Sequence, residues 1–252
     1  MTLRKTARTA TGIAGLDEML SGGFIEGSTF LLRGAPGIGK TTFALQYLLH
    51  GAHNGEPGLM ISFEEFPQSL HRDAVSLGWN LKDLEERELL HLHFTSPQVL
   101  LESLRSPTSA LSRLLLEGDI RRVVLDSVTH FTRLTNDPVE LRAIFNTVVN
   151  ALKREQVTTM LIGEEGRFED RRFEHGKLAY LVDAIVLLRY VEIDSAMQRA
   201  IVVLKMRGSD HIKDIRRYEI LPKQGIVVTG IFEGREGILS GISHRTAVAG
   251  PR

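Results

Sequence analysis

The clearest chemistry in this sequence lies in a glycine-rich run near the N-terminus. Residues 34–41 (GAPGIGKT) satisfy the pattern G-x-x-x-x-G-K-[ST], after the strand-like run Ser28–Arg33 and before a helical pattern over 40–50. Such a loop turns backbone N–H groups toward phosphate oxygens, and the helix N-terminus adds partial positive charge. We therefore predict a P-loop, with Lys40 bridging the β- and γ-phosphates and the Thr41 hydroxyl ligating Mg²⁺. The candidate ATP-binding residues are Gly34, Ala35, Pro36, Gly37, Ile38, Gly39, Lys40, Thr41 and Thr42.

A second candidate feature is an acid at the end of an apolar strand pattern. Arg121–Leu125 reads as a buried strand, and Asp126 follows it directly. Downstream of a P-loop, a carboxylate in this position is typical of a Walker B acid, which holds Mg²⁺ through water. The alternative is an aspartate that only caps a turn or a helix.

Two adjacent carboxylates follow the first strand pattern after the loop. Gly58–Phe63 reads as a strand, which we expect beside the P-loop strand, and Glu64 and Glu65 follow at its carboxyl end. From there they could polarise a water for attack on the γ-phosphate, so both are candidate catalytic residues. The alternative is a pair of solvated acids before the helix that begins at Pro67.

The elements that must position these residues alternate along the chain. Strand patterns alternate with helical patterns from Thr11 to about Ile193, which predicts βαβ units and a mainly parallel sheet flanked by helices. Further helices are expected over Pro67–Leu77, Gln98–Glu117 and Pro138–Glu155, and further strands over Leu89–Phe94 and Val157–Ile162. The last strand patterns follow one another without helices, which predicts antiparallel strands at the C-terminal edge of the sheet. They are Ala184–Ile193, Arg199–Met206, Arg217–Leu221 and Ile226–Val228.

Composition and charge exclude several classes of protein and of site. The chain has 252 residues, 42% of them hydrophobic, enough for a core that needs no metal or disulfide. Lys and Arg (31) balance Asp and Glu (31), so no overall basic field favours DNA or an anionic membrane. Cysteine is absent, which excludes disulfides, cysteine zinc sites and thiol nucleophiles. The lack of a long apolar run or a secretory signal predicts a cytoplasmic protein without a membrane span. We expect one domain over residues 11–241, with flexible tails at 1–10 and 242–252.

Short motifs surround the P-loop in a specific order. The run TGIAGLD at 11–17 and a Gly-Gly pair at 22–23 precede it, and FEE at 63–65 and LDS at 125–127 follow it. KMRGS at 205–209 and His211 lie near the C-terminal end. This set resembles the KaiC family of RecA-like ATPases over residues 11–241. P-loops occur in many families, whereas this combination is far more specific.

The resemblance implies a RecA-like core that assembles with copies of itself into a ring, usually a hexamer, with ATP and Mg²⁺ between neighbouring subunits. By this resemblance Glu64 and Glu65 match the catalytic glutamates of the family, and Asp126 matches its Walker B acid. An unidentified protein partner would also fit a regulatory or signalling ATPase.

The resemblance also implies residues that act across the subunit interface. Lys205 and Arg207 match basic residues that reach the γ-phosphate bound by the adjacent subunit, and Ser209 and His211 match positions near that nucleotide. In a strand, Lys205 and Arg207 share one face because they are two residues apart, as a pair aimed at one phosphate must. The alternative is an exposed basic strand end.

Two departures from the clock protein affect the expected activity. The clock protein has two such domains in tandem, whereas this sequence holds one, as expected for either a single-domain relative or one half of a longer protein. Its second domain phosphorylates itself on a Ser-Thr pair, but residues 160–194 here contain no serine or threonine. Self-phosphorylation at those positions is therefore chemically impossible, which favours ATP hydrolysis as the activity.

Two other functions stay open from the sequence. A RecA-like DNA-binding ATPase could use the segment 163–178, where Arg167, Arg171, Arg172 and Lys177 stand near Phe168 and Phe173. Acids are interspersed with these bases, so the local charge is nearly neutral and DNA is the less favoured partner. The other alternative is a scaffold that binds ATP and changes its oligomeric state with negligible turnover.

Overall fold

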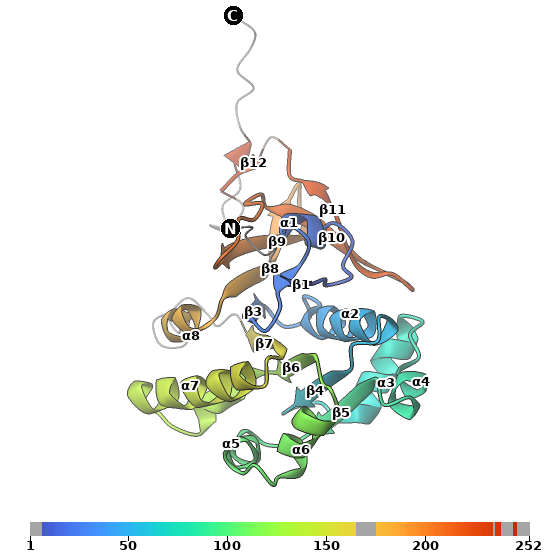
Figure 1. Cartoon of the computed structure of the whole chain (residues 1–252). Helices are drawn as coiled ribbons and strands as arrows, with labels where there is room; N and C mark the ends of the chain where they lie inside the picture. The colour runs from blue at the N-terminus through green and yellow to red at the C-terminus, as the bar shows by residue number, and fades with distance from the viewer. Residues whose placement is uncertain (1–6, 165–174, 234, 238–243, 246–252) are drawn as a thin grey trace, which may run out of the picture.

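The computed structural model describes residues 7–164, 175–233, 235–237 and 244–245. A nine-stranded sheet runs through the described part in the order β11-β10-β9-β8-β3-β7-β6-β4-β5 (Figure 1). The six strands from β8 to β5 are mutually parallel, and β9, β10 and β11 add antiparallel strands next to β8. The mainly parallel sheet with antiparallel strands at the C-terminal edge is therefore confirmed.

The strands of this sheet are, in chain order, β3 Thr29–Gly34, β4 Gly58–Ser62, β5 Leu90–Phe94, β6 Arg122–Asp126, β7 Thr158–Glu164, β8 Ala184–Ile193, β9 Ala196–Met206, β10 Arg216–Leu221 and β11 Gly225–Ile231. The helices are α1 Leu16–Met19, α2 Lys40–His53, α3 Pro67–Ser76, α4 Leu81–Glu86, α5 Pro97–Arg105, α6 Ala110–Glu117, the 3-10 helix η1 Val128–Arg133, α7 Pro138–Arg154 and α8 His175–Leu181. Short strand pairs join β1 Arg8–Thr9 to β2 Phe24–Ile25 and β12 Arg235–Glu236 to β13 His244–Arg245.

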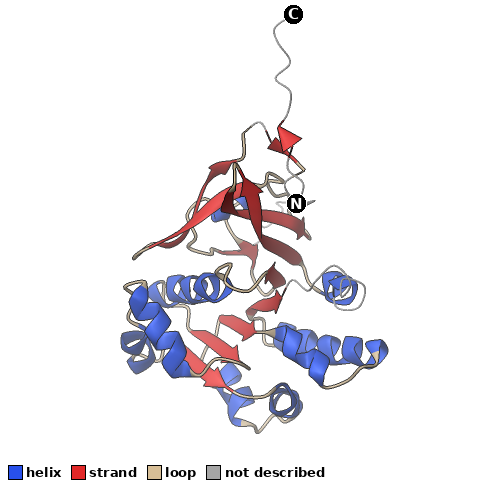
Figure 2. Ribbon diagram, turned by 180° about the vertical axis from the view of Figure 1, so that it is seen from behind, coloured by secondary structure: helices blue, strands red, loops and turns tan. Residues whose placement is uncertain are grey.

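Helices cover both faces of the parallel strands (Figures 1 and 2). Because successive side chains of a strand point to opposite faces, β3 contributes Phe30 and Leu32 to one core and Leu31 to the other. The first core contains apolar side chains of α2, α3 and α4, and the second contains those of α5, α6 and α7. These two layers hold the central strands rigidly, which fixes the loops at their ends.

The carboxyl ends of four parallel strands meet at one edge. In the strand register, Gly34 at the end of β3 lies beside Glu164 of β7, and Asp126 of β6 lies beside Ser62 of β4. The prediction that the strand before Glu64 neighbours the P-loop strand is wrong, because β7 and β6 lie between β3 and β4. Parallel strands are joined by crossover connections, so their order in the chain does not set their order in the sheet.

Some element bounds also differ from the predictions. The helix expected over Gln98–Glu117 is two helices, α5 and α6, because Pro107 lies between them and cannot continue a helix. The short helix α4 was not predicted. Arg8–Thr9 form β1 inside the expected N-terminal tail, where Arg8 donates to the carbonyl oxygens of Leu20 and Gly23. The strand β13 likewise lies inside the expected C-terminal tail.

The TGIAGLD motif forms a loop that leads into α1, where its last two residues, Leu16 and Asp17, lie. Asp17 accepts hydrogen bonds at Oδ1 from the Thr11 N–H and hydroxyl, and at Oδ2 from the Gly12 N–H. Ile13 and Leu16 are buried in the core next to it. These contacts give the motif a structural role.

None of the helices in the described ranges is both long and apolar enough to cross a membrane.

Candidate nucleotide site

The predicted P-loop connects the end of β3 to the start of α2. Gly37 and Gly39 have φ angles of 74° and 106°, a left-handed conformation that favours glycine. No side chain of the described residues caps the N-terminus of α2, so its first N–H groups are left for a ligand. The Lys40 ammonium donates to the carbonyl oxygen of Ala35 at 3.0 Å.

The left-handed conformation of Gly39 favours glycine, and β10 packs closely against this position. A Cβ atom on Gly39 would lie 2.7 Å from the Cδ1 atom of Ile220, which belongs to β10. Strand β10 therefore packs directly against the loop, and the loop cannot move outward without losing this contact.

The predicted Walker B acid lies against the first turn of α2. The Thr41 hydroxyl donates to Asp126 Oδ2 at 3.3 Å. Burial, and after it the charge of Glu65, raises the pKa of Asp126 to about 6, although Lys40 and the Thr41 hydrogen bond act in the opposite direction. Two residues expected to act on Mg²⁺ from separate elements are thus in contact.

The two candidate catalytic glutamates differ in environment. The Ser62 hydroxyl accepts hydrogen bonds from the N–H groups of both, at 3.3 Å for Glu64 and 2.9 Å for Glu65. The Glu64 side chain is 65% exposed, and its Oε2 lies 3.4 Å from His130 Nε2. Burial raises the pKa of Glu65, with a further contribution from Asp73, and its buried Oε2 has no hydrogen-bond partner among the described residues.

A fourth carboxylate, Glu164, was not predicted as a site residue. It ends β7, the direct neighbour of β3, and its N–H donates to the Thr129 hydroxyl at 3.1 Å. Burial lowers the pKa of Lys40, and Glu164 is the strongest of the three carboxylates that oppose this shift, ahead of Asp126 and Glu64. The signal in the sequence was an acid two residues after the apolar strand pattern Val157–Ile162.

The donor set at this edge fits a magnesium ion that arrives with a nucleotide. Three carboxylates act on Lys40, and Glu65 adds a fourth charge beside Asp126, so the elevated pKa of Asp126 reflects an excess of negative charge as well as burial. Within the described residues, no group of three or more His, Asp or Glu side chains could hold a metal unaided. Mg²⁺ is usually held by one or two protein oxygens together with phosphates and water, and Thr41 and Asp126 could supply such oxygens.

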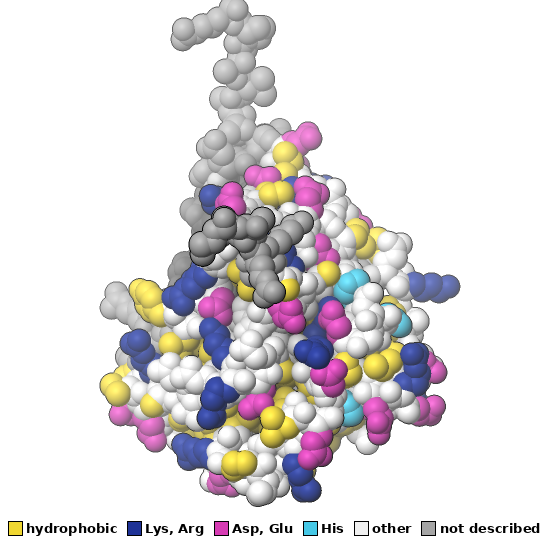
Figure 3. All heavy atoms as spheres, in the orientation of Figure 1, with side chains coloured by type: hydrophobic (Ala, Val, Ile, Leu, Met, Phe, Trp, Pro, Cys, Tyr) yellow, Lys and Arg dark blue, Asp and Glu magenta, His cyan; other side chains and the backbone are white. Residues whose placement is uncertain are grey.

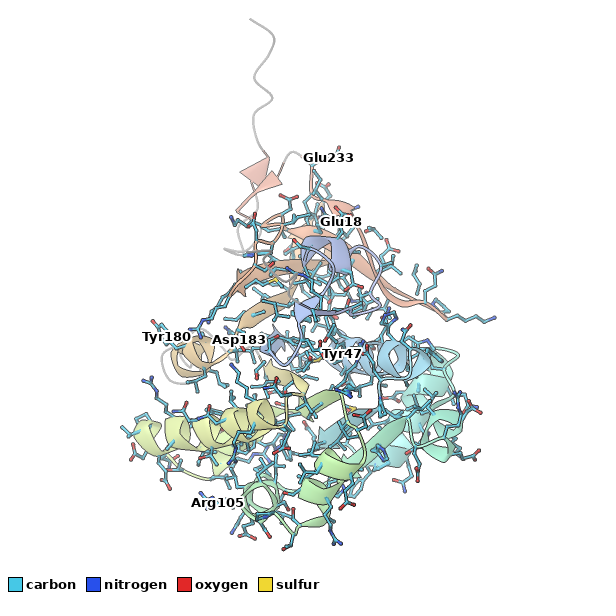
Figure 4. All side chains as sticks on the ribbon, viewed as in Figure 1. Glu18, Tyr47, Arg105, Tyr180, Asp183 and Glu233 are labelled. Carbon is cyan, nitrogen blue, oxygen red and sulfur yellow. The ribbon has the colours of Figure 1, made fainter. Side chains whose placement is uncertain are left out.

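Lys205 and Arg207 lie at the opposite edge of the sheet. In the strand register, Lys205 of β9 lies beside Ile185 of β8, and Ile185 lies beside Leu31 of β3. Leu31 is three residues before Gly34, so Lys205 lies toward the amino end of β3, whereas the P-loop follows its carboxyl end. The Lys205 ammonium donates at 2.6 Å to the carbonyl oxygens of Ala179 and Val182. The Arg207 guanidinium donates at 2.9 Å to that of Tyr180 (Figure 4 labels Tyr180 on α8). Both side chains thus contact the carboxyl end of α8, and neither lies beside the P-loop of its own chain.

Ser209 and His211 follow in a loop near the N-terminal segment. The Ser209 hydroxyl accepts a hydrogen bond from Arg8 at 2.6 Å and donates to the Asp210 carbonyl oxygen. His211 Nδ1 is buried without a partner among the described residues. Among the described residues, neither side chain has a hydrogen bond to the P-loop of the same chain.

Comparison with known proteins identifies the family. The sequence profile described as "ATPase: KaiC" matches residues 9–232, nearly the whole chain. The chain belongs to the KaiC ATPase family. This confirms the resemblance inferred from the motifs.

Relatives of the KaiC family differ in length. The circadian clock oscillator protein KaiC of Thermostichus vulcanus is 33% identical over 242 residues, which cover 96% of this chain and 46% of that protein. A UPF0273 protein of Pyrococcus horikoshii is 34% identical over 241 residues, which cover 88% of this chain and 94% of that protein. The chain therefore spans about half the length of the clock proteins it matches, and nearly the full length of the archaeal relative.

The KaiC-like fold is confirmed by a solved structure. The crystal structure of a KaiC-like protein from Pyrococcus horikoshii matches with a TM-score of 0.79 at 29% identity, covering 89% of this chain and 100% of that one. The nine-stranded sheet therefore has the RecA-like architecture expected for the family.

The segment discussed as a DNA-binding candidate lies mostly outside the described residues. Arg167, Phe168, Arg171, Arg172 and Phe173 fall in 165–174, and the Lys177 side chain is also outside the described part. On the face shown in Figure 3, basic and acidic side chains are interspersed.

Proposed function

We propose that this KaiC-family chain binds ATP with Mg²⁺ and hydrolyses it, as a ring of identical subunits with nucleotide at each interface. The observation that carries this proposal is the convergence of the P-loop, Asp126 and the Glu64–Glu65 pair on one edge of the sheet. A glycine turn with a chance lysine would not bring these carboxylates toward Lys40.

Each group of site residues has a separate role in the proposed hydrolysis. The N–H groups at the start of α2 bind the phosphates, and Lys40 exchanges the Ala35 carbonyl for β- and γ-phosphate oxygens. Thr41 and Asp126 would hold Mg²⁺, directly and through water, and the ion would supply positive charge against the phosphates. Glu64 or Glu65 accepts the proton of the attacking water; the elevated pKa of Glu65 suits a base.

Support for a shared site comes from Lys205 and Arg207. In the strand register, Lys205 is level with Leu31, three residues before Gly34. It is therefore displaced from the P-loop by roughly 10 Å along the strands, toward their amino ends. Two cations at that edge could reach a nucleotide only on a neighbouring subunit. An arginine supplied by a neighbour accelerates phosphoryl transfer by about 10³- to 10⁵-fold in other ATPases and GTPases. The alternative is that the two side chains only cap the carbonyl groups of α8.

The biological role that we propose is regulatory, through a ring whose assembly follows the state of its nucleotide. Residues 160–194 contain no serine or threonine, so self-phosphorylation at the positions used by the clock protein is not part of the proposal. A DNA-binding ATPase and a non-hydrolysing scaffold are the competing functions.

The experiment that tests the proposal measures size and turnover on one sample. The molar mass of the wild-type protein is measured by light scattering with and without ATP and Mg²⁺, and phosphate release is measured on the same sample. We expect ATP-dependent assembly and phosphate release, with both lost in Lys40→Ala, whose substitution removes a ligand contact and leaves the core intact. Assembly without phosphate release would favour the scaffold, and stimulation by DNA would favour the DNA-binding ATPase.

A further inference from the structure

Two tyrosine hydroxyls contact the backbone of the P-loop. The Tyr190 hydroxyl, from β8, donates to the carbonyl oxygen of Gly37 at 2.8 Å. The Tyr218 hydroxyl, from β10, donates to the carbonyl oxygen of Ile38 at 2.6 Å. Two consecutive peptide groups of the loop are thus held by strands that lie more than 150 residues later in the chain.

The surroundings keep both phenols in place as donors. Tyr218 is 1% exposed, and burial raises its pKa well above the usual range of a tyrosine. The Tyr190 ring is half-buried, with the Arg199 guanidinium 5.7 Å from its centroid. Ile220, two residues after Tyr218 in β10, packs against the position of Gly39.

These bonds determine where the loop's N–H groups point. In a trans peptide the C=O of one residue and the N–H of the next point in opposite directions. The Ile38 carbonyl points to Tyr218, so the N–H of Gly39 points away from that tyrosine. The N–H of Ile38 turns inward to the Ala35 carbonyl at 3.4 Å, which closes the loop. A loop without the two phenols could rotate these peptides and point carbonyl oxygens at an anion.

We propose that Tyr190 and Tyr218 are positioning residues of the P-loop, whose hydroxyl groups hold it in the shape that binds the diphosphate part of a nucleotide. The inference rests on the proposed nucleotide site. It gives the C-terminal strands a role in that site: the parallel strand β8 and the antiparallel strand β10 restrain the loop, and β9 lies between them in the sheet.

The four tyrosines of this chain supply the test and its controls. Tyr190→Phe and Tyr218→Phe each remove one hydroxyl from the loop. Tyr47→Phe removes a buried hydroxyl that bonds the Thr158 carbonyl at 3.4 Å, away from the loop, and Tyr180→Phe changes an exposed residue of α8 (both are labelled in Figure 4). The probe is ADP with Mg²⁺, whose dissociation constant is measured by calorimetry.

We expect Kd for ADP to rise about 3- to 10-fold in Tyr190→Phe and in Tyr218→Phe, the size expected for one lost hydrogen bond, and to stay unchanged in the two controls. Thermal unfolding separates positioning from general stability. Tyr47→Phe and Tyr218→Phe should both lower Tm without nucleotide, but only the loop variants should lose part of the rise in Tm that ADP produces.

Two results would overturn the inference. If the wild type binds ADP and both loop variants bind it equally well, the tyrosines do not position the loop, whereas the nucleotide site stands. If the wild type binds no ADP, the nucleotide site fails and the inference fails with it. Tyr190→Phe keeps the test valid if Tyr218→Phe does not fold, because Tyr190 is only half-buried.

Discussion

The carboxylates near the P-loop are the residues on which the proposed chemistry depends. Asp126 is held in a mostly buried position by its contact with Thr41, Glu65 has one buried oxygen without a partner among the described residues, and Glu164 lies beside the P-loop. Several carboxylates close together repel one another, so this arrangement is unfavourable unless a cation is bound beside them. Bound Mg²⁺ would supply it, which links the stability of the site to its ligand.

Replacing Glu64 and Glu65 together by Gln should separate binding from turnover. An amide cannot accept the proton of the attacking water, so we expect ATP binding to persist while phosphate release falls by at least about 100-fold. Glu86→Gln, on the exposed side of α4, is the matched control and should hydrolyse ATP normally. Turnover at the wild-type rate in the double variant would remove both residues from the catalytic site.

Asp126→Asn tests the electrostatics of the site through pH. The pKa of Asp126 is raised from 3.8 to about 6, so the folded protein binds this proton more tightly than the unfolded chain does. Its contribution to stability is complete below pH 3.8 and is lost as the pH rises through 6. The neutral Asn should therefore stabilise nucleotide-free protein at pH 8, on the order of 1–3 kcal/mol, and much less at pH 4.

Urea unfolding at the two pH values, without nucleotide, measures this difference. Asp119→Asn, at an exposed position, should change the free energy of unfolding by less than about 0.5 kcal/mol at either pH. Asp126→Asn should also lose the stabilisation that ATP with Mg²⁺ gives the wild type. A variant that is less stable than the wild type at pH 8 would contradict the assigned environment of Asp126.

At the scale of the elements, a buried arginine joins the N-terminal segment to the sheet. Arg122 of β6 is 1% exposed; its guanidinium pairs with Glu56 at 2.6 Å and donates to the carbonyl oxygens of Ala10 and Tyr47 at 2.8 Å. These contacts connect β6, α2 and the segment before the TGIAGLD loop. They attach Ala10, which precedes the motif, to the sheet.

Arg122→Ala should lower the free energy of unfolding by about 3–5 kcal/mol, because it leaves a carboxylate and two carbonyl oxygens without their donor. The adjacent Arg121→Ala is the matched control: its side chain is 52% exposed and pairs only at the surface with Asp119, so a loss below about 1 kcal/mol is expected. Chemical denaturation compares the two variants. Equal losses would mean that Arg122 does not link these elements.

Much of this arrangement was predictable from sequence, and the failures have physical causes. The P-loop, Asp126, Glu64 and Glu65 could be predicted because phosphate chemistry needs particular residue types next to particular strand ends, and their role stays a prediction. The spatial order of β3, β7, β6 and β4 depends on crossovers that leave no local pattern, so the neighbour of Gly34 and the place of Glu164 were missed. Tyr190 and Tyr218 act through backbone carbonyls, for which no motif exists.

At the scale of the whole molecule, the two edges of the sheet carry complementary halves of the proposed interface. The P-loop and the acids lie at the carboxyl ends of the parallel strands. Lys205 and Arg207 lie toward the amino ends of those strands, where their side chains contact carbonyl groups at the end of α8. A ring in which one edge faces the opposite edge of the next subunit would complete every site. Nucleotide binding, assembly and turnover would then be coupled.

The most direct measurement mixes two inactive variants and follows phosphate release. One carries Lys205→Ala and Arg207→Ala, and should bind ATP through its own P-loop but lose ATP-dependent assembly and turnover together. The other carries Glu64→Gln and Glu65→Gln. In mixed rings, some interfaces combine intact glutamates with an intact basic pair, so we predict that part of the activity returns. Mixed rings that demonstrably form and release no phosphate, or a monomer that hydrolyses ATP at the wild-type rate, would contradict action between subunits.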